Sequence, residues 1–92
     1  MLTLKTTGKF KRDYKRMKSQ GKDMSVLQDV IDTLLMEKPL DIKHHDHPLS
    51  GKYIGFRECH ITPNWLLFYP TDRKQLILTA IRTGTHSDLF DE

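Results

Sequence analysis

The chain is poor in the features that would place it outside the cell or in a membrane. It has one cysteine, Cys59, so no intrachain disulfide can form and a reducing, cytoplasmic compartment is expected. No apolar run approaches the roughly 18 residues of a membrane span, and the N-terminus lacks the pattern of a secretory signal. Cys59 has no neighbours of the kind that activate a thiol, so it is interpreted as a small strand residue.

Repeats, linkers and low-complexity segments are also missing, and residues 1–92 are expected to form a single domain. The spacing of apolar residues predicts a strand, two helices, a long polar loop, three strands and a short tail. In chain order these are 2–6, 10–20, 23–38, 40–52, 53–61, 65–69, 75–82 and 86–92, with 83–85 leaving the sheet. The predicted fold class is α+β, in the order β-α-α-β-β-β, with a helical hairpin on one face of a mainly antiparallel sheet and a groove on the other face.

Positive charge is concentrated at one end of the chain. Residues 1–22 hold eight Lys or Arg residues and a single acid, Asp13, whereas the remainder is net negative by four. Five basic residues at the start of the first predicted helix and within it are assigned to substrate binding: Lys9, Lys11, Arg12, Lys15 and Arg16. Such a block is typical of a surface that binds a polyanion or an acidic protein, although a merely solvated helix face has the same composition.

Residues able to transfer protons gather in the second half. Side chains alternate along a strand, so Glu58 and His60 are expected on one face. Arg82 ends the last predicted strand, His86 follows it, and His47 enters from the loop. RNA cleavage needs a base that takes the proton of the 2′-hydroxyl, an acid that protonates the leaving 5′-oxygen, and a positive group that stabilises the negative charge of the phosphate in the transition state. Two histidines and an arginine can supply all three without a metal. Glu58 is expected either to orient His60 or to act as the base.

Each of these residues also has a plainer interpretation. A strand histidine is commonly structural, and Glu58 beside Arg57 fits a weak surface pair. Trp65 offers a stacking face to an unpaired base, but the apolar run that it opens equally favours the core. The run of residues 44–47, with three histidines, lacks a second ligand pair of metal-site spacing, so no metal and no cofactor are predicted.

The order of these residues resembles the YafQ-like branch of the RelE/ParE toxin superfamily. Four stretches carry the resemblance: Asp46-His47-Pro48-Leu49, Phe56-Arg57-Glu58-Cys59-His60-Ile61, Asn64-Trp65-Leu66-Leu67, and 82–90, which reads RTGTHSDLF. Members of this branch are toxins of type II toxin–antitoxin modules that cut messenger RNA, typically on the ribosome and without a metal. The resemblance therefore implies mRNA, the ribosome and an antitoxin as partners, and no membrane.

The resemblance also implies roles for single positions. His47, His60, Arg82 and His86 match residues implicated in catalysis, while Trp65 and Phe90 match the aromatic positions. Two residues depart from the family pattern. Asn64 stands where an aspartate can precede the tryptophan, and Glu58 stands where an aspartate can precede the strand histidine. Asn64 is therefore assigned to substrate binding, and the general base is expected to be Glu58 or a histidine.

Three functions remain open at this point. The first is a metal-independent endoribonuclease, with the basic helix docked on ribosomal RNA. The second is a ParE-like toxin that binds DNA gyrase, against which the histidine set argues. The third is a non-catalytic module that binds RNA or the ribosome.

Overall fold

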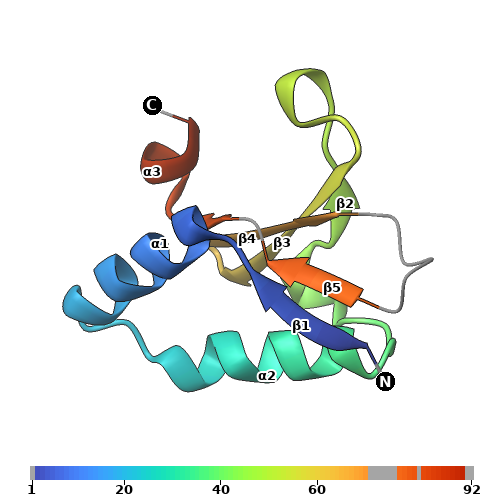
Figure 1. The fold of residues 1–92 in the computed structure, drawn as a ribbon, viewed down its shortest axis with the longest axis horizontal. Helices are drawn as coiled ribbons and strands as arrows, with labels where there is room; N and C mark the ends of the chain where they lie inside the picture. Colours follow the sequence, from blue (N-terminus) through green and yellow to red (C-terminus); the bar gives the residue numbers. More distant parts are fainter. Residues whose placement is uncertain (1, 71–76, 81, 91–92) are drawn as a thin grey trace.

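The described part of the chain forms six strands and three helices in an α+β arrangement (Figure 1). The structure, a computed structural model, describes residues 2–70, 77–80 and 82–90, and for 77–80 and His86 it describes the backbone alone. The strands are β1 (Thr3–Thr6), β2 (His47–Pro48), β3 (Phe56–Thr62), β4 (Trp65–Pro70), β5 (Ile77–Ala80) and β6 (Arg82–Gly84). The helices are α1 (Gly8–Ser19), α2 (Met24–Leu35) and α3 (His86–Phe90), and the 3-10 turns are η1 (Ile42–His44) and η2 (Gly51–Tyr53).

Both predicted long helices are confirmed, and local sequence explains where they begin. The Thr7 hydroxyl accepts a hydrogen bond from the Phe10 amide at the start of α1, and the Asp23 carboxylate accepts one from the Ser25 amide at the start of α2. These caps satisfy amides that have no partner within the helix. Gly21, with φ of 78°, makes the left-handed turn between the helices, which suits glycine. Apolar residues of both helices face the sheet.

The sheet differs from the predicted meander in its last part. Strands β2, β3, β4 and β6 form an antiparallel sheet in that order, whereas β5 pairs in parallel with β1. The single strand predicted over 75–82 is therefore wrong, although 75, 76 and 81 lie outside the described residues. Residues 83 and 84, predicted to leave the sheet, belong to β6, and the predicted tail contains α3.

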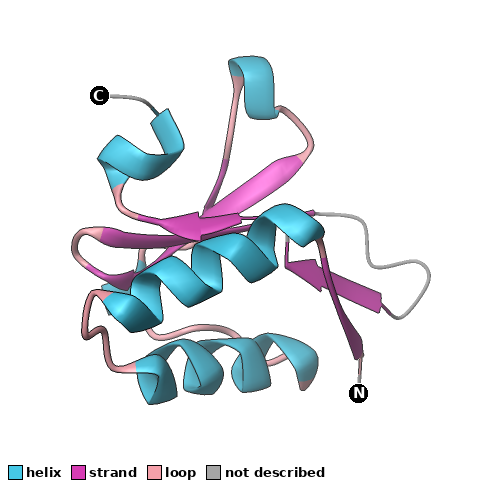
Figure 2. Ribbon diagram, turned by 60° about the vertical axis from the view of Figure 1, so that its left-hand side comes forward, coloured by secondary structure: helices cyan, strands magenta, loops and turns pink. Residues whose placement is uncertain are grey.

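Apolar side chains cover both faces of the antiparallel sheet. The larger core joins α1 and α2 to Cys59, Ile61, Trp65, Leu67 and Tyr69. A smaller cluster on the opposite face contains Leu66, Phe68 and Leu89, with Leu49, Tyr53 and Phe90 packed against it. Figure 2 shows α3 and η2 on the side of the sheet away from α1 and α2. The face predicted to be free is thus partly covered, and the remaining open part lies over β2 and β3.

Among the described residues, no helix is both long and apolar enough to span a bilayer.

Candidate active site

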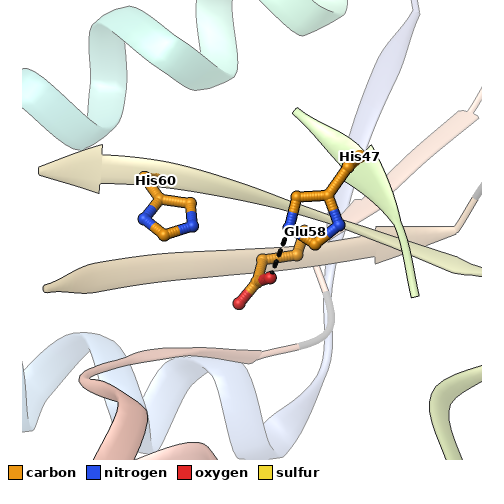
Figure 3. A group of neighbouring side chains, drawn as sticks. All are labelled: His47, Glu58 and His60. Carbon is orange, nitrogen blue, oxygen red and sulfur yellow. Dashed lines mark ion pairs between the residues drawn. The ribbon is translucent and has the colours of Figure 1, made fainter. Parts of the chain in front are cut away.

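Strand pairing brings His47 to Glu58. In the antiparallel ladder between β2 and β3, His47 is the direct partner of Glu58, and Glu58 is in turn opposite Phe68 of β4. Paired residues share a face, so His47 and Glu58 point away from α1 and α2. His60, two residues along β3, lies on the same face, as the strand alternation predicted. Figure 3 shows these three side chains side by side above the sheet.

His47 and Glu58 form an ion pair of unequal exposure. The His47 Nε2 atom lies 2.8 Å from Glu58 Oε2, and the side chains are 47% and 6% exposed, respectively. His47 Nδ1 donates to the Pro48 carbonyl at 3.0 Å. Because both ring nitrogens face acceptors, the arrangement suits an imidazolium, or a neutral ring beside a protonated carboxyl. Glu58 Oε1 is buried and has no hydrogen-bond partner among the described residues.

The sequence left two roles open for Glu58, to orient His60 or to act as the base. The structure pairs Glu58 with His47. His60 is instead supported by its own strand end and by the preceding loop. Its Nδ1 atom lies 3.3 Å from the Pro63 carbonyl, and its own carbonyl accepts a hydrogen bond of 2.6 Å from His44 Nδ1. The His47 and His60 rings have centroids 6.4 Å apart. The His60 ring therefore lies beside the His47–Glu58 pair and has a hydrogen bond of its own to Pro63.

The residue before His47 anchors the loop from the other side. Asp46 accepts hydrogen bonds from the Tyr69 hydroxyl and from Arg57 Nε, the latter at 3.1 Å. Burial and the bond to Asp46 raise the pKa of Tyr69 above its ordinary value. Because Asp46 is held on the helix-facing side of the sheet, the next residue, His47, is directed to the opposite face. Sequence reasoning missed Asp46 and Tyr69 as supports.

Arg82 is placed by a buried carboxylate that sequence reasoning also missed. Asp13 of α1 accepts bonds from Arg82 Nε at 2.7 Å and from Arg82 Nη2 at 3.1 Å. The bond to Asp13 raises the pKa of Arg82, which keeps the guanidinium charged. Asp13 is 2% exposed and was counted in the sequence only as the one acid of a basic segment. Its apolar neighbours at helical spacing, Phe10 and Met17, are the signal that could have placed it on the buried side.

The aromatic candidates divide between core and surface. The assignment of Trp65 to substrate binding is corrected: its side chain is buried, and Nε1 donates to the Thr83 hydroxyl at 2.8 Å. Because β4 lies between β3 and β6, a ring on its helix-facing side cannot meet an RNA base. Phe90 is half-buried and, with Tyr53 and Lys52, lines a hollow of about 290 Å³.

The remaining predicted residues have separate positions. Asn64 is exposed in the turn that follows β3. His86 is the first residue of α3, and its side chain lies outside the described part of the chain. Of the predicted basic set, Lys9, Lys11, Arg12 and Lys15 are exposed. Arg16 differs, because its Nη2 atom bonds Asp13 at 3.0 Å.

Comparison with known proteins assigns a family to this arrangement. The family model described as "Bacterial toxin of type II toxin-antitoxin system, YafQ" matches residues 2–91. The chain belongs to the YafQ toxin family. A relative from Escherichia coli K12, the mRNA interferase toxin YafQ, is 38% identical over 86 residues, which cover 91% of this chain and 90% of the relative.

Solved structures of YafQ-like toxins share the fold. A metal-bound toxin from Helicobacter pylori is 42% identical, with a TM-score of 0.91, and covers 98% of this chain and 100% of its own. YafQ in the E. coli DinJ–YafQ complex is 34% identical, with a TM-score of 0.88, and covers 98% of this chain and 99% of its own. The predicted YafQ-like resemblance and the α+β fold class are thereby confirmed.

A metal ion would find suitable ligands in the same group. One ligand atom from each of His47, Glu58 and His60 lies within 4.8 Å of the other two. Imidazole nitrogens and a carboxylate oxygen suit zinc and copper, and the unpartnered Glu58 Oε1 adds a further donor. No metal was predicted because the sequence shows no second ligand pair at metal-site spacing. The pairing of β2 with β3, which brings His47 to Glu58, has no signal in the local sequence. The residues present therefore fit a metal, and the prediction of a metal-free site stays a prediction.

Proposed function

We propose that this YafQ-family toxin is an mRNA interferase that cuts messenger RNA with its own side chains. The observation that carries the proposal is the cluster of His47, Glu58 and His60 on the open sheet face, where the first two share a 2.8 Å contact. Two imidazoles and a buried carboxylate within one group can accept and return protons near neutral pH. The E. coli relative that shares 38% of its residues is named for this activity.

The first step of cleavage needs a base for the RNA 2′-hydroxyl. We assign it to the His47–Glu58 pair in the form in which the pair has lost its shared proton. Because His47 Nε2 and Glu58 Oε2 are 2.8 Å apart, the pair can accept one proton from the 2′-hydroxyl and hold it between the two side chains. The buried Glu58 holds the ring of His47 in place, and the exposed ring reaches the substrate.

The second step needs a proton for the departing 5′-oxygen and a positive group that stabilises the negative charge of the phosphate. His60 and His86 are the two candidates for the acid, and the experiment below separates them. Arg82 supplies the positive charge, since a guanidinium held on one edge by Asp13 can present its remaining N–H groups to phosphate oxygens. The 2′-oxygen displaces the 5′-oxygen, so the product carries a cyclic 2′,3′-phosphate.

The substrate contacts outside the cluster follow from exposure and charge. Phe90 offers a ring to an unpaired base at the hollow that it forms with Tyr53 and Lys52, and Asn64 offers an exposed amide. The exposed basic residues of α1 suit the phosphates of ribosomal RNA. Ribosomes are accordingly the proposed place of cleavage, and the cytoplasm the proposed compartment.

A bound metal would alter this site. His47, Glu58 and His60 would hold the ion, which would supply Lewis-acid charge. The same ion would occupy the lone pairs that the proposed proton transfers use. We therefore expect cleavage to persist in EDTA and to slow when Cu²⁺ or Zn²⁺ is added.

An antitoxin is the proposed protein partner. The E. coli neighbour was solved as a complex with DinJ, and this chain shares its fold. The net positive charge of residues 1–22 favours an acidic antitoxin segment on α1, while apolar contacts would supply most of the affinity.

Purified protein incubated with a translated message tests the proposal, with and without ribosomes and with EDTA, by mapping the 5′ ends. Cleavage should appear at defined sites, survive EDTA, and stop when a single 2′-deoxynucleotide stands at the cut. His47→Ala, Glu58→Gln and Arg82→Ala should each lower the rate by about 10²-fold or more. Glu37→Gln, at an exposed glutamate of the α2–η1 connection, is the matched control and should cleave normally.

His60→Ala and His86→Ala locate the acid. The variant that lacks the acid should lose the limb of the pH–rate profile that requires a protonated group, and should regain rate on a substrate with a better leaving group. An intact message with wild-type protein would overturn the nuclease. Growth arrest without cleavage would then favour the gyrase-binding or ribosome-binding alternatives.

A further inference from the structure

Asp13 of α1 accepts four hydrogen bonds, and three of them come from strand β6 and not from its own helix. Besides Arg82 Nε and Nη2, its carboxylate accepts hydrogen bonds from the Thr83 amide at 3.2 Å and from Arg16 Nη2 at 3.0 Å. Among the described residues, it is the one buried aspartate. A carboxylate that accepts four bonds from two guanidinium groups and an amide has one fixed orientation.

The bonds to Asp13 join α1 to β6 at one edge of the sheet, and Arg16 extends the contact to α3. Strand β6 is the end strand of the antiparallel sheet, and α1 lies along it, so Asp13 satisfies the outward-facing Thr83 amide. Arg16 also lies 3.6 Å from Asp88 of α3 through its Nε atom. A Cβ atom on Gly84 would come within 3.0 Å of the Asp88 Cβ and 3.2 Å of Arg16 Nη2. Glycine at 84 therefore permits α1 and α3 to meet over β6.

We propose that Asp13 is a positioning residue for RNA cleavage, which acts by fixing the Arg82 guanidinium toward the scissile phosphate. This inference rests on the proposed function, in which Arg82 stabilises charge on that phosphate. The bonds recorded for Arg82 use Nε and Nη2, so one edge of the planar fork is held by protein. In the strand pairing, Arg82 is opposite Phe68 and Phe68 is opposite Glu58, so Arg82 belongs to the sheet face that carries the His47–Glu58 pair. Nη1, with two N–H groups, is the part of the fork that we assign to the substrate phosphate.

The rate effect follows from orientation. An arginine without a hydrogen-bond partner samples many rotamers, and restricting it to one rotamer in the transition state costs conformational entropy. Asp13 fixes the side chain before the substrate arrives, which lowers this entropic cost. The charge of Arg82 persists without Asp13, so the affinity for RNA should remain while the chemical step slows. A purely structural Asp13 would instead change stability and leave the rate of the folded enzyme alone.

Asp13→Asn tests this in single-turnover cleavage with saturating protein, well below the melting temperature. We expect a fall of about 10-fold to 10²-fold in the rate, the scale of a small misplacement, with RNA affinity unchanged or tighter. In an Arg82→Ala background, Asp13→Asn should have no further effect within twofold. Asp29→Asn, at an exposed aspartate of α2, makes the same charge change and should cleave as wild type.

Two results would overturn the inference. One is folded Asp13→Asn protein that cleaves at the wild-type rate, and the other is an equal loss with and without Arg82. Failure of the proposed function is distinguishable, because then wild-type protein yields no cleavage at all. If Asp13→Asn does not fold, Asp13→Glu retains the charge on a longer arm and should show the same slower rate.

The NMR signal of the Arg82 Nε–H gives a second measurement that needs no variant. It should exchange with water far more slowly than that of the exposed Arg12, and Asp13→Glu should speed it. Equal exchange for the two arginines in the wild type would overturn the fixed orientation.

Discussion

Residues on the helix-facing side of the sheet position a candidate catalytic residue on the opposite side. Tyr69 and Arg57 lie on the helix-facing side, yet their bonds to Asp46 determine where His47 emerges on the other side. The catalytic candidate is thus positioned by residues that no substrate touches. Its preorganisation depends on a hydrogen bond between a buried phenol and a half-buried carboxylate.

Tyr69→Phe tests this support. Removal of the hydroxyl should lower the free energy of unfolding by about 1.5–3 kcal/mol, the range for a hydrogen bond to a charged group. It should also slow cleavage, because Asp46 then depends on Arg57 alone. Denaturant unfolding and single-turnover rates measure the two effects. An unchanged rate with lower stability would show that His47 is placed without Tyr69.

The same substitution changes the alkaline stability. Burial and Asp46 raise the Tyr69 pKa in the folded state above the unfolded value of about 10. The contribution of Tyr69 is therefore complete below pH 10 and is lost as the pH rises further. Between about pH 10 and 11.5, wild type should lose more stability than Tyr69→Phe. Burial also raises the pKa of Cys59, so the comparison is made between proteins that both retain Cys59.

At the residue scale, the sequence predicted which neighbouring strand residues share a face better than it predicted which side chains are buried. Strand alternation correctly put Glu58 and His60 on one face, because that period is local. Trp65 could not be placed, since its partner Thr83 lies 18 residues away in a different strand. In the sequence, Asp13 was counted only as one acidic residue of a basic segment. Its role in the structure depends on the bond to Arg82, which lies 69 residues away and could not be predicted from local sequence.

At the scale of elements, the short helix α3 is stabilised at its N-terminus by a reciprocal pair of capping hydrogen bonds. The Thr85 hydroxyl accepts a bond from the Asp88 amide at 3.2 Å, and the Asp88 carboxylate accepts one from the Thr85 amide at 3.1 Å. This reciprocal cap matters because a five-residue helix is unstable by itself. Leu89, packed on Leu66 and Phe68, supplies the tertiary anchor.

Thr85→Ala should loosen α3 without unfolding the sheet. Loss of a cap costs about 0.5–2 kcal/mol, and here the cost falls on the helix that carries His86 and Phe90. Amide hydrogen exchange should quicken in α3 and stay slow in β3 and β4, while the cleavage rate drops. Thr85→Ser keeps the hydroxyl and is the control. Unchanged α3 exchange in Thr85→Ala would contradict the capping role.

The elements themselves were predictable where their signals are local. The spacing of apolar residues predicted α1 and α2, and the residues between the apolar runs 53–61 and 65–69 predicted the β3–β4 connection. The break between β5 and β6 had no such signal, because β5 pairs with β1 across more than 70 residues of chain. The pairing of β2 was equally hidden, since two residues carry no periodicity.

At the scale of the whole molecule, charge is separated between α1 and the remainder. Helix α1, which carries exposed basic residues, packs on β6, the strand that begins at Arg82. Association with RNA should therefore be steered toward the site and weaken with salt. Arg16 is the exception within α1, because its charge is already compensated by Asp13 and Asp88.

Salt dependence of RNA binding separates free from compensated charges. Lys11→Gln and Lys15→Gln should each reduce the slope of log affinity against log salt by about 0.7, the value per phosphate on a single strand. Lys38→Gln, at an exposed lysine outside this helix, is the control and should leave the slope unchanged. Arg16→Gln should change the slope less than either lysine variant but lower thermal stability, because Asp13 loses one of its donors. An Arg16 effect on the slope equal to that of Lys15 would mean that RNA displaces its acidic partners, and α1 would then bind RNA through all its cations.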